Sequence, residues 1–350
     1  MVVVGADVHK RSHTFVAADA VGKKLGQLTV DATTKGHQKA LAWVRTSFPG
    51  EVVWAIEDCR HLSARLERDL LTAGQKVVRV PPKMMAMVRA SARTRGKSDP
   101  IDALAVARAF LREPDLPVAS HDAVSRELKL LVDRRESLVN TRTRTINSLL
   151  WRVHELDPEH APKPRSMDLA KHQQALRSWL LGLDGIVAEL AVDELNDVIA
   201  LTGRINEFHK RITDLVEKAA PTLTSLPGCG ALTAAKLVGE SAGITRFADE
   251  AKFARHAGVA PIPVWSGNTA GRVRMTRSGN RQLNAALHRI AVTQIRVDGC
   301  LGKVYYEKKK AEGMSKTEAL RCLKRRLART VFNHLLTDNK AATASQPAAA

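Results

Sequence analysis

Four acidic residues lie at the ends of predicted helices and strands, in an order that could build a metal site. Asp7 and Glu57 each come directly after an apolar run. Asp99 and Asp102 open a predicted helix, and residues three apart project from one side of a helix. Carboxylate oxygens suit Mg²⁺, with Mn²⁺ as the second candidate. Two such ions roughly 4 Å apart activate an attacking oxygen and stabilise a leaving one in phosphodiester chemistry.

Each acid also has a structural interpretation. Asp99 precedes a proline and could cap a helix, a role whose loss costs about 1 kcal/mol. Asp102 could be a first-turn charge that complements the helix dipole. Glu57 is followed by Asp58, and one of the two must face solvent. The joint placement of four acids in one fold favours the catalytic interpretation.

The elements that must position these acids form a definite series over residues 1–111. Strands are predicted at 2–6, 13–18, 24–30, 52–56 and 76–80, and helices at 35–46, 62–73 and from 98, with a break at Pro81-Pro82. Three strands followed by alternating helices and strands is the connectivity of the ribonuclease H fold, an α/β class with a mixed sheet. The right-handed crossover rule places the strand ending at Ile56 beside the first strand. Asp7 and Glu57 should therefore lie together.

The remainder of the chain has a helical pattern. The sequence predicts domains over 1–115, 120–219 and 222–335, and a disordered tail over 340–350. The middle domain is all-α: either a coiled-coil arm or spacer that promotes oligomerisation, or a helical subdomain folded on itself. The last domain is mainly α, and its Gly228 and Gly230 form a turn typical of a helix-hairpin-helix, which offers backbone N–H groups to a phosphate. A plain interhelical turn is the alternative.

Charge points to a polyanionic partner. The formal net charge is +19, and residues 251–297 contain no acid. Basic segments without acidic residues indicate a phosphate-binding surface. The alternative is a soluble enzyme that is basic but binds no nucleic acid. The candidate nucleic-acid contacts are Lys83, Arg89, Arg93, Arg95, Lys97, Arg272, Arg274, Arg277 and Arg281. Residues 79–97 could equally be a linker, and the basic run 303–329, which includes acids, could be a solvated helix face.

The sequence lacks the patterns of membrane-spanning, secreted and zinc-binding proteins. No apolar run approaches the roughly 20 residues of a membrane span, and the N-terminus lacks a secretory signal pattern. The four cysteines are scattered and form no zinc-binding spacing, which indicates reduced thiols in the cytoplasm.

Two sets of motifs resemble a known family. GADVHKRSH, AIED and KSDPIDALAVARA are similar to the DEDD domain of the insertion-sequence one-ten family of transposases, which is related to the Piv-type DNA invertases and has a RuvC-like fold. GVAP, SG and GN, within residues 258–280, are similar to the C-terminal transposase domain of that family. The resemblance covers nearly all of residues 1–335. It departs after Glu57, where Asp58-Cys59-Arg60 replaces a glycine common in the family.

The resemblance implies residue roles and partners. The acid motif maps onto Asp7, Glu57, Asp99 and Asp102. Ser266, which by its own context is a turn residue before Gly267, maps onto the serine that attacks DNA and forms a covalent phosphoserine. The implied partners are double-stranded donor and target DNA, a structured guide (bridge) RNA, and further copies of the chain as a dimer or tetramer. The implied location is the nucleoid of a bacterial cytoplasm.

Three hypotheses about function follow. The first is a recombinase that excises and inserts a mobile element by strand transfer through Ser266. The second is a RuvC-like, structure-selective nuclease that uses the carboxylates alone and ends in hydrolysis. The third is a nucleic-acid-binding protein without catalysis. Replacement of Ser266 separates the first two hypotheses, and metal-dependent cleavage separates both from the third.

Overall fold

The computed structural model divides into two compact units, Met1–His121 and Asp122–Ala350. It describes residues 1–57, 62–90, 98–116, 118–119, 122–264, 268, 272–275 and 279–344. We call the two parts the N-terminal and C-terminal units. Within the described residues, no helix is both long enough and apolar enough to cross a membrane.

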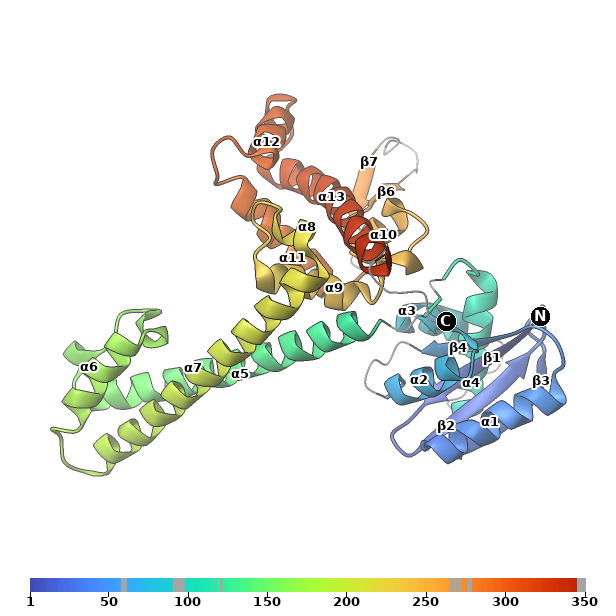
Figure 1. Ribbon diagram of the computed structural model, residues 1–350, viewed down its shortest axis with the longest axis horizontal. Coiled ribbons are helices and arrows are strands. Elements are labelled where there is room, and N and C mark those ends of the chain that lie inside the picture. Colours follow the sequence, from blue (N-terminus) through green and yellow to red (C-terminus); the bar gives the residue numbers. More distant parts are fainter. Residues whose placement is uncertain are drawn as a thin grey trace. The chain divides into compact units, whose positions relative to one another are not determined.

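The N-terminal unit is built on a five-stranded mixed sheet (Figure 1). Its strands are β1 (Val2–Val8), β2 (Ser12–Ala18), β3 (Lys24–Asp31), β4 (Val52–Glu57) and β5 (Lys76–Val80). Their spatial order is β3-β2-β1-β4-β5. The first three strands pair antiparallel, whereas β4 pairs parallel with β1 and β5 pairs parallel with β4. This is the ribonuclease H-like topology, and the predicted neighbourhood of β1 and β4 is confirmed.

Helices cover both faces of this sheet, because alternate residues of the central strands point to opposite sides. The helices are α1 (Thr34–Ser47), α2 (Ala64–Thr72), α3 (Pro82–Ala90) and α4 (Asp99–Arg112). Val4 on β1 packs in one cluster with residues of α1 and α2. Val3 packs in a second cluster with residues of α3 and α4. The domain is thus a three-layer α/β structure.

Helix α3 corrects the predicted break at Pro81-Pro82. The helix begins at Pro82, immediately after β5 ends at Val80. A proline is tolerated in the first helical turn because its missing N–H has no partner there in any helix. The Pro81 carbonyl accepts the N–H of Met84 at 2.9 Å, which closes the first turn. Part of the segment predicted to be a linker or a phosphate contact is therefore helical.

A pair of buried histidines lies on the α1 side of the sheet. The rings of His13 and His37 are stacked with centroids 5.2 Å apart, and His37 Nδ1 lies 2.6 Å from a carboxylate oxygen of Asp69. Burial, and next the neighbouring His37, lower the pKa of His13 from 6.5 to about 4. The folded chain therefore keeps His13 neutral under conditions in which an exposed histidine takes up a proton.

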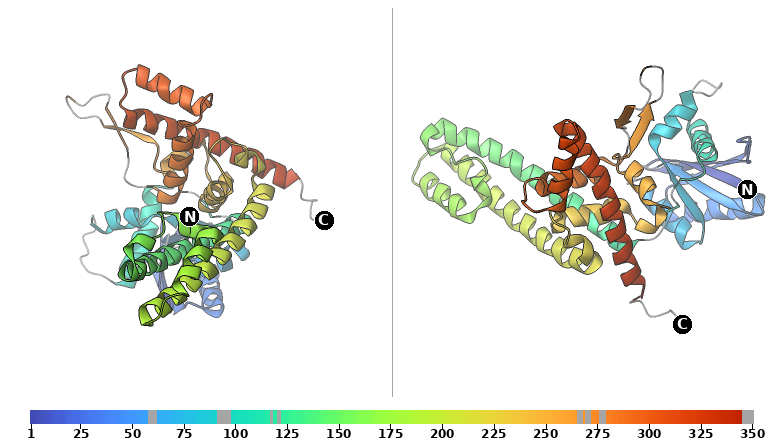
Figure 2. Two further views of the ribbon diagram at one scale, coloured as in Figure 1. Left: turned by 90° about the vertical axis from the view of Figure 1, so that its left-hand side faces the viewer. Right: turned by 90° about the horizontal axis from the view of Figure 1, so that it is seen from above.

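The C-terminal unit begins with a long helical hairpin. Helices α5 (Ala123–Leu156) and α7 (Ile186–Ala219) lie side by side, with η1 (Pro158–His160), η2 (Ser166–Asp168) and α6 (Ala170–Leu180) between them in sequence (Figures 1 and 2). The ion pair Arg152–Glu194 near one end and the ion pair Glu127–Arg211 near the other show that the pair is antiparallel. Both predictions for this segment hold in part: it is an arm, and the arm folds on itself.

The rest of the unit packs around the base of this hairpin. It comprises α8 (Pro221–Thr224), α9 (Ala231–Ser241), η3 (Ile244–Arg246), α10 (Glu250–His256), the strand pair β6 (Pro261–Val264) and β7 (Arg272–Met275), α11 (Arg281–Gln294), α12 (Leu301–Ala311) and α13 (Lys316–Ala344). One hydrophobic core joins Leu128 of α5 and Val216 of α7 to residues of α9, α10, α11 and α13. The predicted spacer and the predicted last domain thus share a core.

The end of the chain departs from the predicted tail. Helix α13 continues through Ala344, so residues 340–344 are helical where disorder was predicted. Alanine has the highest helix propensity, and the alanines near this end can prolong a helix whose earlier turns are already packed.

We expect Gly5→Ala to destabilise the N-terminal unit. A Cβ at Gly5 would lie 2.0 Å from the Ala103 carbonyl oxygen and 2.7 Å from the Ala107 nitrogen, both in the backbone of α4. Overpacking of this kind costs about 1–3 kcal/mol, and rigid backbone atoms place the effect at the upper end. Denaturant unfolding of the full chain measures it. The control is Gly203→Ala in α7, where a Cβ meets nothing within 4 Å and where alanine should be neutral or stabilising.

Acidification should also destabilise the chain. Between pH 6.5 and about 4 the unfolded chain binds a proton at residue 13 that the folded chain excludes, so the free energy of unfolding falls as the pH falls through this window. Thermal unfolding of the full chain from pH 7.5 to pH 4 measures the slope. His13→Phe keeps a ring at this position without a titrating group and should flatten the slope. Identical slopes for the two proteins would contradict this role of His13.

Candidate metal centre

Two of the predicted acids lie at the ends of the central parallel strands. Asp7 is the sixth residue of β1, and Glu57 is the last residue of β4. Both therefore belong to their strands, whereas the sequence analysis placed them just after. Ala6 pairs with Ile56 in the β1–β4 register, so Asp7 and Glu57 occupy the next positions on neighbouring strands. The parallel pairing brings these two chain positions to one edge of the sheet.

The other two acids lie in the first turn of α4. Ser98 has an extended backbone at the cap position, and its carbonyl accepts the N–H of Asp102 at 3.0 Å. Proline at the second helical position fits because it needs no donor there. The Asp102 side chain is buried, whereas that of Asp99 is 52% exposed. Asp99 therefore faces the opening of the site and Asp102 lies deeper.

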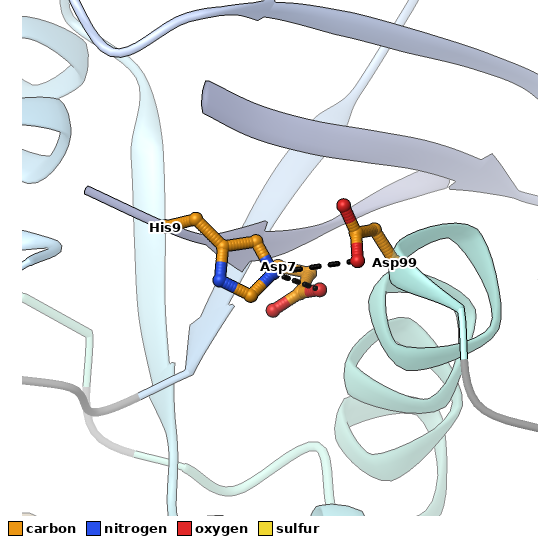
Figure 3. A group of neighbouring side chains, drawn as sticks. All are labelled: Asp7, His9 and Asp99. Carbon is orange, nitrogen blue, oxygen red and sulfur yellow. Dashed lines mark hydrogen bonds and ion pairs between the residues drawn. The ribbon is translucent and has the colours of Figure 1, made fainter. Parts of the chain in front are cut away.

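His9 joins the two groups of acids, and the sequence analysis did not select it. Its Nε2 lies 3.1 Å from Asp7 Oδ2 and 3.4 Å from Asp99 Oδ1 (Figure 3). One ligand atom from each of these three residues lies within 4.8 Å of the other two, a spacing that allows them to share one metal ion. The available signal was the spacing Asp-x-His: residues two apart in an extended chain point to the same side.

The surroundings of Asp7 disfavour its negative charge. Burial raises the pKa of Asp7 above its ordinary value, and the charges of Asp102 and Asp99 raise it further, whereas His9 lowers it. A raised pKa means that the negative charge on Asp7 is under-compensated by the protein alone. A bound cation would supply the missing compensation, which is the electrostatic behaviour expected of a metal ligand.

Arg89 of α3 approaches Asp102. Its Nε lies 3.1 Å from Asp102 Oδ1, yet that oxygen has no hydrogen-bond partner with good alignment among the described residues. The contact is therefore an ion pair without a well-directed hydrogen bond. Arg89 was predicted to contact nucleic acid, and its contact with Asp102 through Nε leaves that prediction untested. Because this buried oxygen of Asp102 is incompletely satisfied, it could serve as a ligand to a metal ion.

Three of the four predicted acids interact in the structure. Asp99 and Asp102 both act on the charge of Asp7. Among the described residues, the close group of ligand atoms contains neither Glu57 nor Asp102. Oxygen donors with one imidazole suit Mg²⁺ or Mn²⁺, and imidazole favours the softer Mn²⁺. The residues present therefore fit a divalent ion, with Asp102 on the same helix as Asp99 and Glu57 at the end of the neighbouring strand β4.

The predicted nucleophile and several predicted basic contacts lie outside the described residues. These are Ser266, Arg93, Arg95, Lys97 and Arg277, together with Asp58 beside Glu57. Lys83 lies on α3 and Arg272 on β7, but nothing is described of their side chains. Arg274 of β7 and Arg281, the first residue of α11, are described and exposed.

The predicted phosphate-binding turn is present as a turn before α9. Gly228 has a φ of +82°, a conformation that favours glycine, and a Cβ there would lie 3.0 Å from Thr293 Cβ. Gly230 occupies the cap position of α9 without a side-chain hydrogen bond, and open space surrounds its Cα hydrogens. The predicted turn before a helix is thus present, and the helix-hairpin-helix and its binding of phosphate stay predictions.

Comparisons with known proteins agree with this architecture. Residues 4–155 match the DEDD transposase model of IS110, described as "Transposase", and residues 220–307 match the model of the "Transposase IS116/IS110/IS902 family". The chain is 27% identical to an uncharacterized 44.8 kDa protein of insertion element IS116 from Streptomyces clavuligerus, over 98% of this chain and 96% of the relative. It is 27% identical to an uncharacterized 42 kDa protein of insertion element IS900 from Mycobacterium paratuberculosis, over 92% of each.

Solved structures of RuvC from Thermus thermophilus are similar to 34% of this chain. One is RuvC alone and one is its complex with a Holliday junction substrate. They are 17% and 16% identical to this chain, with TM-scores of 0.27 and 0.26, and 99% of each RuvC chain is covered.

The topology and the acid cluster define a ribonuclease H-like domain of the kind found in DNA-processing enzymes, joined to a largely helical unit. The two family matches, over residues 4–155 and 220–307, identify the particular group: the chain belongs to the IS110 family of transposases.

Removal of His9 should weaken binding of Mn²⁺ more than binding of Mg²⁺, because imidazole is the softer ligand. We expect His9→Ala to lower Mn²⁺ affinity by at least about tenfold, since even an outer-shell partner of a metal ligand is worth this much. Isothermal titration of the full chain with each ion measures the difference. His209→Ala, an exposed histidine of α7, is the control. Equal loss for both ions would count against direct coordination by His9.

Proposed function

We propose that the chain catalyses transposition of an insertion element by cutting and rejoining DNA, using a divalent metal held by Asp7, His9 and Asp99. The observation that carries this proposal is the meeting of three ligand atoms within 4.8 Å, from the end of β1 and the start of α4. Asp102 and Glu57 are the further carboxylates of the site. Membership of the IS110 family supplies the biological setting.

The residues of the chain would divide the work by their burial. Asp7, which is buried, anchors the ion, and its charge becomes stable once a cation is present. Asp99, half-exposed, lies where a DNA phosphate would approach. His9 holds both carboxylates in place by contacts at 3.1 and 3.4 Å. When bound, the metal would supply Lewis-acid stabilisation of charge on the reacting phosphate.

We further propose that Ser266 is the nucleophile of strand transfer. The support is the resemblance of the segments around it to the transposase domain, and the family match that spans residues 220–307. The serine oxygen would attack the phosphorus, the 3′ or 5′ oxygen of the broken strand would leave, and a phosphoserine would hold the other strand end. A guide RNA and an oligomer belong to the same proposal. The net charge of +19 is compatible with two nucleic-acid partners.

Asp7→Asn should abolish metal-dependent cleavage by the purified chain, supplied with DNA carrying the element ends and with RNA transcribed from the non-coding end. Loss of a charged metal ligand removes the ion, whereas nucleic-acid affinity should persist because a negative charge near phosphate is lost as well. Gel assays of cleavage and of binding measure the two properties separately. Asp31→Asn, an exposed acid at the end of β3, is the charge-matched control. Normal recombination by Asp7→Asn would refute the assignment.

Ser266→Ala separates strand transfer from hydrolysis. We expect this variant to bind metal and DNA normally but to form neither recombinant product nor covalent protein–DNA adduct on a denaturing gel. A nuclease that uses the carboxylates alone would retain cleavage in the same variant. The hydrolytic alternative would be established if Ser266→Ala retained cleavage and the unmodified chain formed no covalent adduct.

A further inference from the structure

The C-terminal unit contains a large cleft that the proposed chemistry does not use. Its volume is about 1660 Å³, and its walls come from α10, α12, α13 and the β6–β7 strand pair. Pockets for small ligands usually have volumes of about 300–1,000 Å³. The size of this cleft therefore suits part of a polymer better than a single small molecule.

Arginines dominate the polar lining. Arg321, Arg325 and Arg329 follow one another at four-residue intervals on α13, and all line the cleft. With a rise of 1.5 Å per residue, such positions are about 6 Å apart along one side of the helix. Arg274 lines the cleft from β7. Cations repeated at this interval suit a chain of phosphates.

The acids of the cleft cancel only part of this charge, because five arginines and three glutamates line it. Glu250 lies 2.7 Å from Arg329 Nε and 3.4 Å from an Arg325 nitrogen, and these contacts lower its pKa. Glu318 accepts hydrogen bonds from the N–H and the hydroxyl of Ser315. Glu312 pairs with Lys309. Among the described residues, neither Arg321 nor Arg274 has a hydrogen bond or an ion pair, so their guanidinium groups are open to a ligand.

The cleft also offers flat and apolar surface. The guanidinium carbon of Arg326 lies 4.7 Å from the ring centroid of Tyr305, and both residues line the cleft. A guanidinium held against a ring presents a plane on which a nucleobase can stack. Val273, 58% exposed, and Met314 add apolar lining. A duplex keeps its bases stacked inside and presents mainly phosphate and sugar, so these surfaces match unpaired bases.

We propose that this cleft binds an unpaired stretch of nucleic acid, with phosphates on the arginines of α13 and at least one base stacked on Arg326. The proposal rests on the proposed function only in taking nucleic acid as the polymer. It adds the strandedness of the ligand and the place where the ligand binds.

The test is fluorescence-anisotropy binding of the full chain to labelled oligonucleotides in EDTA, so that cleavage plays no part. Single-stranded DNA, single-stranded RNA of the same sequence and the corresponding duplex are compared over a series of salt concentrations. We expect Arg326→Ala and Arg326→Lys to weaken binding of a single strand about tenfold each, because lysine keeps the charge but not the stacking plane. Arg321→Ala should reduce the salt slope by about 0.7, the loss of one phosphate contact. The two single strands show whether DNA or RNA is preferred.

Lys308→Ala, an exposed cation of α12 that does not line the cleft, should bind as the unmodified chain does. Thermal unfolding of each variant confirms that the fold is retained. Equal loss of single-strand and duplex binding in both Arg326 variants would overturn the proposal, as would unchanged single-strand binding by both variants. Retained cleavage by Asp7→Asn would instead refute the metal site and leave the cleft proposal standing, so the two failures are distinguishable.

Discussion

Strand β1 and helix α4 approach each other closely at Gly5, where a Cβ would meet the Ala103 carbonyl oxygen at 2.0 Å. This contact sets the distance between two elements whose acids are more than ninety residues apart in the sequence. Asp7 follows Gly5 by two residues on the same face of the strand, and Asp99 and Asp102 open the helix that packs there. A larger side chain at residue 5 would move the helix and separate the carboxylates.

Once the acids are this close, their charges must be balanced. The charges of Asp99 and Asp102 act on Asp7, and the protein sets His9 against Asp7 and Arg89 against Asp102. Neither offset is complete: Asp7 keeps a raised pKa, and Asp102 Oδ1 lacks a well-aligned hydrogen bond. A cation that took Asp102 as a ligand would compete with Arg89. Metal binding would in this way change the contact between Asp102 and α3, the helix that carries this arginine.

The sequence predicted the succession of strands and helices, the neighbourhood of β1 and β4, and the place of Asp99 and Asp102 at the start of a helix, because these depend on local patterns and on one strong topological rule. His9 was missed because a single histidine does not indicate a metal site in the sequence; only the fold brings it close to Asp99 of α4. Helix α3 was missed because two prolines usually end regular structure, whereas here the second proline occupies a first turn, where it is tolerated. The continuation of α13 to Ala344 depends on the packing of its earlier turns, which composition at the chain end does not reveal.

The two ends of the helical arm should differ in their stability against local unfolding. Its two long helices are stabilised by two separate groups of apolar side chains, one shared with the base of the C-terminal unit and one around Leu149, Leu176 and Leu195 at the far end. Stability in proteins is distributed over such cooperative segments, which can open independently. The far group is the smaller of the two and is made only from α5, α6, α7 and the short turn η2. Amide protons at that end should exchange through partial opening, while those near the base should require disruption of the whole unit.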